Sequence, residues 1–189
     1  MKIWKNDQKQ TTIDLPERVY AMDTVNHLLV VAMASRLINI YDLRKGNEPM
    51  QKRESSLKYQ TRVTRCFPSG EGFACGSIEG RISIDFFDPN PNIQSQKYAF
   101  KCHRIPVADD QAKKEMVYPV NSLSFHPVYQ GTFASGGSDG VIGVWDRFNR
   151  KRLRQYKNYP TGISALSFNS TGDILAVASS YGFEEGEKE

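Results

Sequence analysis

Residues 134–146 read ASGGSDGVIGVWD, and this stretch decides the fold. Residues 136–140 match the G-x-S-x-G pattern of serine hydrolases, in which Ser138 would be the nucleophile. That reading requires a helix directly after the serine. Here Asp139-Gly140 is instead a hairpin turn signal, and a short run of β-branched and aromatic residues follows it. The local prediction is strand, tight turn, strand, which makes Ser138 a hairpin residue and leaves no catalytic residue in this stretch.

The same order of strands, turn and closing aspartate recurs along the chain. The whole order is present in residues 62–88, with the turn Glu79-Gly80, and in residues 19–42, with a weaker turn at Ser35-Arg36. Residues 163–181 hold only its beginning, and residues 1–4 resemble its end. Self-similarity at a nearly fixed period is the signature of a repeat architecture.

These units are of the WD40 type, in which four-stranded sheets pack as the blades of a β-propeller. The signature dipeptide is Trp145-Asp146, and the predicted stand-ins for it are Tyr41-Asp42 and Phe87-Asp88. The first two closing aspartates are separated by nearly the ~40–45 residues expected of one blade. The second and third are further apart, and we assign the excess to a charged surface loop at residues 105–117. The sequence therefore predicts an all-β chain.

The expected domain organisation is one partial propeller over residues 1–189. Its parts are the end of one blade at 1–14, blades at 15–60 and 61–104, the loop at 105–117, a blade at 118–157 and an incomplete blade at 158–189.

Composition excludes several classes of function. The chain of 189 residues carries a net charge of only +4 and no long Lys/Arg block, which argues against bulk nucleic-acid binding as its main activity. No apolar run approaches ~18 residues and no signal peptide is recognisable, so we expect a soluble intracellular protein without a membrane role. Cys66, Cys75 and Cys102 are odd in number and lack C-x-x-C spacing, and Cys102-His103 has no matching second pair. We expect neither metal nor cofactor.

Three cations are expected on one rim of the propeller. In an antiparallel blade, the connections into the first strand lie at the same rim as the turns between the second and third strands. Arg62 precedes a first strand, Arg81 follows the Glu79-Gly80 turn, and Lys101 lies near the end of the fourth strand. Together they would hold a carboxylate or phosphate, whereas pairing with neighbours such as Glu79 would make them ordinary surface charges.

Two tyrosines are expected on the same rim. Tyr118 and Tyr159 each precede a proline just before a predicted first strand. Aromatic residues and arginines are the usual anchors of a peptide interface, although such tyrosines can also simply pack a loop.

The tryptophan blade contains members of the hydrogen-bonded cluster found in WD repeats. That cluster joins a turn Asp, a Ser or Thr on the second strand, a His before the first strand and the Trp. Asp139, Ser135 and Trp145 take three of these places, and Asp146 closes the unit. Residues 118–120 read YPV where a Gly-His pair is expected, so the cluster is predicted to be incomplete.

Longer peptides resemble one family of WD40 propellers, that of the mitotic spindle-assembly checkpoint, which carries the Bub kinase and its Mad/BubR relatives to kinetochores. They are RESSLKYQTR (53–62), GSIEGRISIDFFDPNP (76–91), KYAFKCHR (97–104), YPVNSLSFHP (118–127) and GGSDGVIGVWDRFNRKRLRQYKNYPTGISALSF (136–168). The resemblance extends over residues 15–181. The sister family of Rae/Gle messenger-RNA export factors shares SIEGR, FKCHR and SDG, but RESSLKYQTR and KRLRQYKNYP look more like the checkpoint branch.

The resemblance implies a function and a site. Members of the family are non-enzymatic seven-bladed adaptors of the nucleus and of mitotic kinetochores. They bind GLEBS-type motifs of checkpoint kinases across the top face and phosphothreonine Met-Glu-Leu-Thr repeats of a kinetochore scaffold. Arg62, Arg81 and Lys101 would engage the acidic GLEBS side chains and the phosphothreonine. The alternative is an export-type propeller that binds a nucleoporin GLEBS motif and contacts RNA through basic rim residues.

The sequence departs from the family in length. Family members have about three more blades before the position where this sequence begins, so it holds about four blades of the ring. A propeller removes its strand edges only by closing. We therefore expect either part of a longer protein, as in a fragment or an incomplete gene model, or closure by pairing with a second copy.

Overall fold

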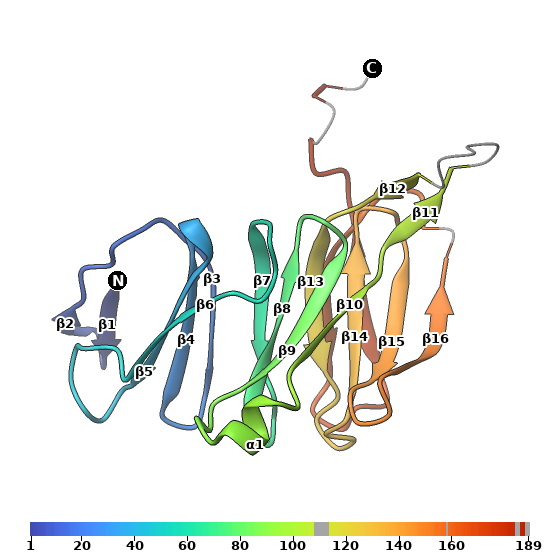
Figure 1. Cartoon of the computed structure of the whole chain (residues 1–189). Helices are drawn as coiled ribbons and strands as arrows, with labels where there is room; N and C mark the ends of the chain where they lie inside the picture. The colour runs from blue at the N-terminus through green and yellow to red at the C-terminus, as the bar shows by residue number, and fades with distance from the viewer. Residues whose placement is uncertain (108–113, 158, 184–185, 188–189) are drawn as a thin grey trace.

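A computed structural model describes residues 1–107, 114–157, 159–183 and 186–187, and it shows antiparallel sheets standing side by side (Figure 1). The first four-stranded sheet contains β3 (Val19–Val25), β4 (Leu28–Met33), β5 (Leu37–Asp42) and β6 (Gln51–Glu54). The second contains β7 (Thr61–Cys66), β8 (Gly72–Ser77), β9 (Arg81–Phe86) and β10 (Tyr98–Lys101). The third contains β13 (Val120–Phe125), β14 (Thr132–Gly137), β15 (Ile142–Asp146) and β16 (Lys151–Tyr156).

Three two-stranded sheets and two short helical segments complete the described part of the chain. The pairs are β1 (Lys2–Lys5) with β2 (Gln8–Thr12), β11 (Arg104–Pro106) with β12 (Glu115–Val117), and β17 (Ile163–Phe168) with β18 (Leu175–Ser179). The helical segments are η1 (Ala34–Arg36) and α1 (Pro91–Gln94). Neither of these helices is long and apolar enough to cross a membrane.

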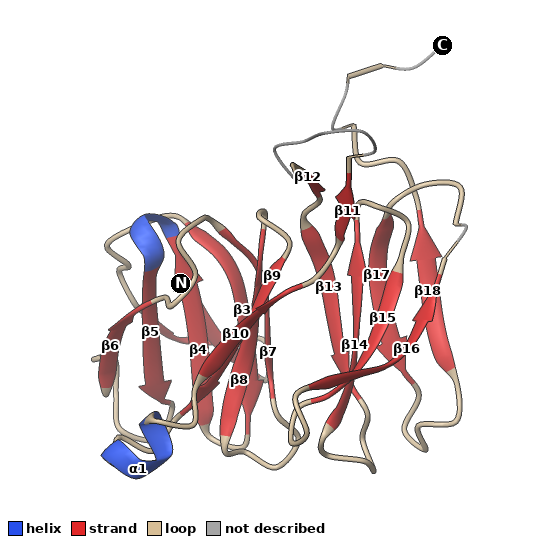
Figure 2. Ribbon diagram, turned by 45° about the vertical axis from the view of Figure 1, so that its right-hand side comes forward, coloured by secondary structure: helices blue, strands red, loops and turns tan. Residues whose placement is uncertain are grey.

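Each four-stranded sheet is a meander whose first strand packs against the first strand of the next. β3 lies beside β7, β7 beside β13, and β13 beside β17, while β6, β10 and β16 are the outer strands (Figure 2). The apolar core lies between the sheets. Ile82 and Ile84 of β9, for example, belong to one buried cluster with Leu123 and Phe133 of the next sheet. Burial between neighbouring faces is what holds such layers together.

Close approach of the sheets requires small residues at the contact. A Cβ atom on Gly76 would lie 2.8 Å from side-chain atoms of Val63 and Val120, so no larger residue fits there without displacement.

Two other glycines are needed for their backbone conformation. Gly80 and Gly140 have positive φ angles of 60° and 67°, each in the turn between the second and third strands of its sheet. These turns lie at the end of the sheets that we call the upper rim, at the top of Figure 1, where β7 and β13 also begin.

Two sequence-based predictions are wrong in detail. The run at 105–117, expected to be a loop, contains the strands of the β11–β12 hairpin, with Arg104 opposite Val117, while its residues 108–113 lie outside the described part. The second blade also has a different stand-in for Trp-Asp. Trp145 and Asp85 each lie five residues after their turn glycine and pair with Phe133 and Phe73. The equivalent of Trp145-Asp146 is therefore Asp85-Phe86, not Phe87-Asp88.

Candidate peptide-binding rim

The three predicted cations lie at the upper rim of the second sheet, but in two groups. Arg81 and Lys101 are cross-strand partners at the start of β9 and the end of β10. Arg62 lies on β7, at the irregularity in register between Thr61 and Val63. Because β7 is the inner strand and β10 the outer one, the sequence correctly places these cations at one end of the sheet but does not show their separation across it.

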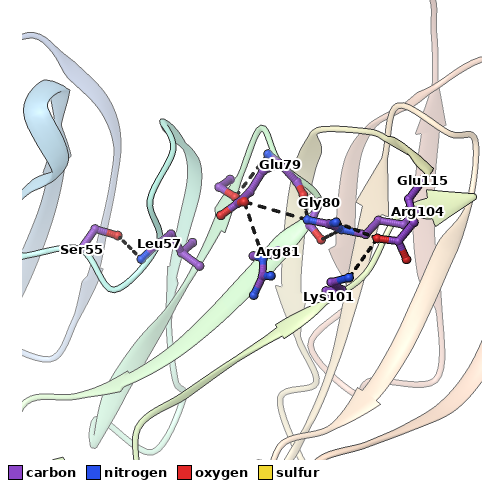
Figure 3. Close-up of polar contacts among 9 residues, drawn as sticks. Ser55, Leu57, Glu79, Gly80, Arg81, Lys101, Arg104 and Glu115 are labelled. Atoms are coloured by element: carbon purple, nitrogen blue, oxygen red, sulfur yellow. Dashed lines mark hydrogen bonds and ion pairs between the residues drawn. The ribbon is translucent and has the colours of Figure 1, made fainter. Parts of the chain in front are cut away.

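The outer group forms an ion-pair network with two glutamates (Figure 3). Nε of Arg81 lies 3.6 Å from Oε2 of Glu79. Nζ of Lys101 donates to Oε2 of Glu115 at 3.0 Å, and Nη1 of Arg104 donates to the same oxygen at 2.9 Å. Arg104 also donates through Nη2 to the Glu79 carbonyl at 2.8 Å, which braces the turn before β9. We call Glu79, Arg81, Lys101, Arg104 and Glu115 the rim network.

Sequence reasoning missed Arg104 and Glu115. Arg104 directly follows the KCH segment that holds Lys101, but only the fold shows that its side chain reaches the turn before β9. Glu115 lies on β12, which the sequence did not predict as a strand. The available signal was the pairing of a basic KCHR segment with acidic residues in the following charged run.

The rim network carries a net positive charge, and its Lys101 and Arg81 side chains are accessible to solvent, whereas those of Arg104 and Glu79 are mostly buried. Three cations face two carboxylates, and the side chains of Lys101 and Arg81 keep 54% and 35% of their exposure. Hydrogen bonds from Lys101 and then Arg104 hold the pKa of Glu115 below its usual range, so this carboxyl is charged at neutral pH. An anion that approaches the rim would therefore meet Lys101, which already binds the Glu115 carboxylate, and Arg81, which lies beside the Glu79 carboxylate.

Arg62, the cation on the inner strand, lines a cavity of about 450 Å³ at the upper rim, whose other lining residues include members of β13, β17 and the segments that precede them. Arg62, Tyr118 and Tyr159 all line it, as do Asn121 and Thr161. The structure therefore brings both predicted tyrosines to the cavity that Arg62 lines. The carbonyl-type oxygen of Asn121, Oδ1, is buried and accepts no hydrogen bond from the described residues, although Nδ2 donates to Ser138 and Ile163.

The tryptophan blade has a full hydrogen-bonded cluster, so the prediction that it is incomplete is wrong. Nε1 of Trp145 donates to Oγ of Ser135 at 2.8 Å, and Ser135 Oγ lies 2.9 Å from Nε2 of His103. Nδ1 of His103 lies 2.9 Å from a carboxylate oxygen of Asp139. Asp146 is not in this cluster, because its carboxylate accepts hydrogen bonds from the turn that follows β15.

The histidine was missed because the β11–β12 hairpin separates it from β13 in the sequence. The backbone N–H of Tyr118 donates to the carbonyl of His103 at 3.0 Å, which closes the base of the hairpin and brings His103 next to β13. No Gly-His pair is therefore needed at residues 118–120. With both ring nitrogens engaged and the residue only 7% exposed, His103 is a structural residue and not half of a metal pair with Cys102.

This cluster positions the rim network. His103 lies between Lys101 and Arg104 in sequence and is anchored in the next sheet, while the N–H of Cys102 donates to the Gly80 carbonyl at 2.8 Å. The segment that carries two rim cations is thus fixed to a turn of its own sheet and to the next sheet.

Comparison with known proteins agrees with this architecture. A family model described as "WD domain, G-beta repeat" matches residues 115–146. The β-propeller domain of Cps50 (Swd1) from Myceliophteria thermophila has a TM-score of 0.66 and 13% identity, over 86% of this chain and 49% of that one. A likeness at that identity shows the fold alone. The predicted WD40 β-propeller class is confirmed.

Closer relatives are similar over nearly all of this chain. It is 60% identical to the mitotic checkpoint protein BUB3.1 of Arabidopsis thaliana, over 92% of this chain and 49% of the relative. It is 49% identical to the mitotic checkpoint protein bub3 of Dictyostelium discoideum, over 100% and 57%. The poly(A)+ RNA export protein of Schizosaccharomyces pombe is 43% identical, over 98% and 51%. The chain thus spans about half the length of the curated relatives it matches.

Proposed function

This chain belongs to the family of Bub3-type WD40 checkpoint proteins, and from that premise we propose that it is an adaptor that docks checkpoint kinases onto phosphorylated kinetochore repeats. In this proposal it has no enzymatic activity. It works in the nucleus and, in mitosis, at kinetochores. Its ligands are GLEBS-type motifs of Bub and Mad/BubR kinases and phosphothreonine Met-Glu-Leu-Thr repeats of a kinetochore scaffold.

The observation that carries the proposal is the pairing of Arg81 with Lys101 across β9 and β10 at the exposed rim. A phosphothreonine carries roughly −1.5 to −2 charges and three acceptor oxygens near neutral pH. The guanidinium of Arg81 offers a planar set of donors, and the ammonium of Lys101 adds a point charge beside it. A rigid pair of neighbouring strands therefore presents both kinds of phosphate donor from fixed backbone positions.

The inner cavity supports the kinase-motif part of the proposal. Arg62 supplies a cation at its edge, and Tyr118 and Tyr159 supply aromatic surface. An acidic peptide with apolar side chains would find both kinds of contact there, since aromatic and arginine residues are common anchors in peptide interfaces.

Charge reversal tests the phosphopeptide site. We expect Arg81→Glu and Lys101→Glu each to abolish measurable binding of a fluorescent Met-Glu-Leu-phosphothreonine peptide in an anisotropy titration, with unchanged circular dichroism. Lys52→Glu, an exposed cation on β6 of the first sheet, is the matched control and should bind normally. Unchanged affinity in both rim variants would refute the assignment of the site.

An export role is the second candidate, because export proteins are also among the relatives, including the mRNA export factor GLE2 of Chaetomium thermophilum at 41% identity. In that case the cavity would hold a nucleoporin GLEBS segment. Pull-down with the tagged chain distinguishes the two, because recovery of a nucleoporin without checkpoint kinases would favour export.

A further inference from the structure

The cations of the rim network already bind a carboxylate of the protein itself, that of Glu115. A single oxygen of Glu115 accepts hydrogen bonds from both Lys101, at 3.0 Å, and Arg104, at 2.9 Å. A carboxylate held by two cationic donors mimics the way a phosphate oxygen would be held. Figure 3 shows Glu115 reaching these cations from β12, across from the Glu79 turn.

The element that carries Glu115 is held in place only weakly. β11 and β12 contribute three residues each, with three register pairs between them. Every residue of β12 is exposed, including Met116 at 53% and Val117 at 40%. A two-stranded hairpin without a buried apolar face has little stability of its own, so moving its end costs little free energy.

Charge balance indicates that Glu115 and a phosphate exclude each other. With Glu79 and Glu115 in place, the three cations leave one net positive charge for an incoming group that carries nearly two negative charges. Withdrawal of Glu115 frees a second positive charge and the donors of Lys101 and Arg104. The phosphate is then matched in charge and in hydrogen bonding.

We propose that Glu115 is an internal competitor for the rim cations, which a phosphothreonine must displace and which thereby sets the affinity for phosphorylated peptide. This inference rests on the proposed function. A neutral threonine gains nothing from displacing a carboxylate, so the competition acts only on the phosphorylated form. The weak net contribution of exposed ion pairs to stability gives Glu115 little value as a structural support alone.

The test is calorimetric titration of the 189-residue chain with a Met-Glu-Leu-phosphothreonine peptide and with its unphosphorylated form. We expect Glu115→Gln to tighten phosphopeptide binding about two- to fivefold, the range that exposed ion pairs allow, and to leave the unphosphorylated peptide unchanged. A misfolded variant would bind more weakly, so tighter binding cannot result from loss of structure. The matched control is Glu54→Gln, which removes an exposed carboxylate paired with Arg36 at 2.8 Å in the first sheet and should change neither affinity.

The outcomes separate the inference from the function beneath it. If wild-type protein prefers the phosphopeptide and Glu115→Gln binds it no more tightly, the competitor role is refuted while the proposed function stands. If neither protein prefers the phosphopeptide, the proposed function itself is refuted and the inference with it. A preference that strengthens in Glu115→Gln alone supports both.

Discussion

His103 and Ser135, thirty-two positions apart in sequence, lie 2.9 Å apart between Nε2 and Oγ, and this contact joins the rim segment to the neighbouring sheet. Because His103 also contacts Asp139 and shares Ser135 with Trp145, one buried cluster fixes the backbone from which Lys101 and Arg104 extend. The stability of the propeller and the geometry of its candidate site therefore depend on the same histidine.

Replacing His103 should destabilise the fold and weaken peptide binding together. His103→Ala removes one hydrogen-bond partner each from the buried Asp139 carboxylate and the Ser135 hydroxyl, which keep the bonds from the Val141 N–H and from Trp145. Loss of a buried polar partner costs about 1–3 kcal/mol. We expect a loss of roughly 2–4 kcal/mol in the free energy of unfolding, measured by urea denaturation. His27→Ala is the control, since its side chain is 39% exposed and lies 4.0 Å from Asp42. An equal effect of both substitutions would argue against the special role of the cluster.

Arg104 should contribute to the site through its fork of donors. Arg104→Lys keeps the charge but cannot contact the Glu79 carbonyl and the Glu115 carboxylate at once. The turn before Arg81 then loses the hydrogen bond from Arg104 to the Glu79 carbonyl. We therefore expect phosphopeptide affinity to fall about three- to tenfold, with little change in the unfolding midpoint. Arg154→Lys on the exposed strand β16 serves as the control. Wild-type affinity in Arg104→Lys would show that the charge alone is sufficient.

Much of the fold is predictable because its signals are local. Turn pairs such as Asp139-Gly140 and Glu79-Gly80 need a positive φ at glycine, and the flanking apolar residues alternate with the period of a strand. The blade-like order of sheets follows from repetition of that pattern. The rim position of Arg81 and Lys101 follows from strand direction alone.

The errors occurred where the structure depends on contacts distant in sequence. The β11–β12 hairpin separates His103 from β13 in the sequence, so the histidine does not stand directly before the strand where the repeat pattern predicts it. Phe87-Asp88 matches the aromatic-aspartate signature in residue type alone, whereas Asp85, which occupies the tryptophan position, is a buried carboxyl that accepts a hydrogen bond from Ser83. The contacts of Glu115 with Lys101 and Arg104 are not predictable from the sequence, because they form only when the β11–β12 hairpin is folded.

The three cysteines should be unreactive in the folded protein. Burial, and after it the charge of the nearby Asp23, raises the pKa of the Cys66 thiol to about 12. Burial also raises the pKa values of Cys75 and Cys102. Since the thiolate is the reactive form, Ellman's reagent at about pH 8 should label almost no thiol in the native chain and all three in guanidinium. Rapid stoichiometric labelling of the native protein would contradict this burial.

Acidification should remove the contribution of the Glu71–Arg147 pair to stability. Arg147 is 5% exposed, its guanidinium carbon lies 4.4 Å from the ring centre of Phe67 and 4.2 Å from that of Phe148, and it donates to Glu71 at 2.8 Å. The hydrogen bond from Arg147 is the main cause that lowers the pKa of Glu71 from its ordinary value of 4.5. Because the pKa in the folded state is the lower one, the stabilisation is fully present above about pH 4.5 and is lost as the pH falls through the folded value.

Glu71→Gln isolates this effect, because glutamine can still accept a hydrogen bond from Arg147 but carries no charge. We expect the variant to be less stable than wild type near neutral pH, by a modest amount since the Glu71 side chain is 58% exposed. The two proteins should converge in urea titrations as the pH falls through the lowered pKa of Glu71. Glu48→Gln, at an exposed acid of the first sheet's loop, should show no such convergence. A stability difference that persists unchanged in acid would mean that packing of the side chain, and not its charge, compensates the buried guanidinium.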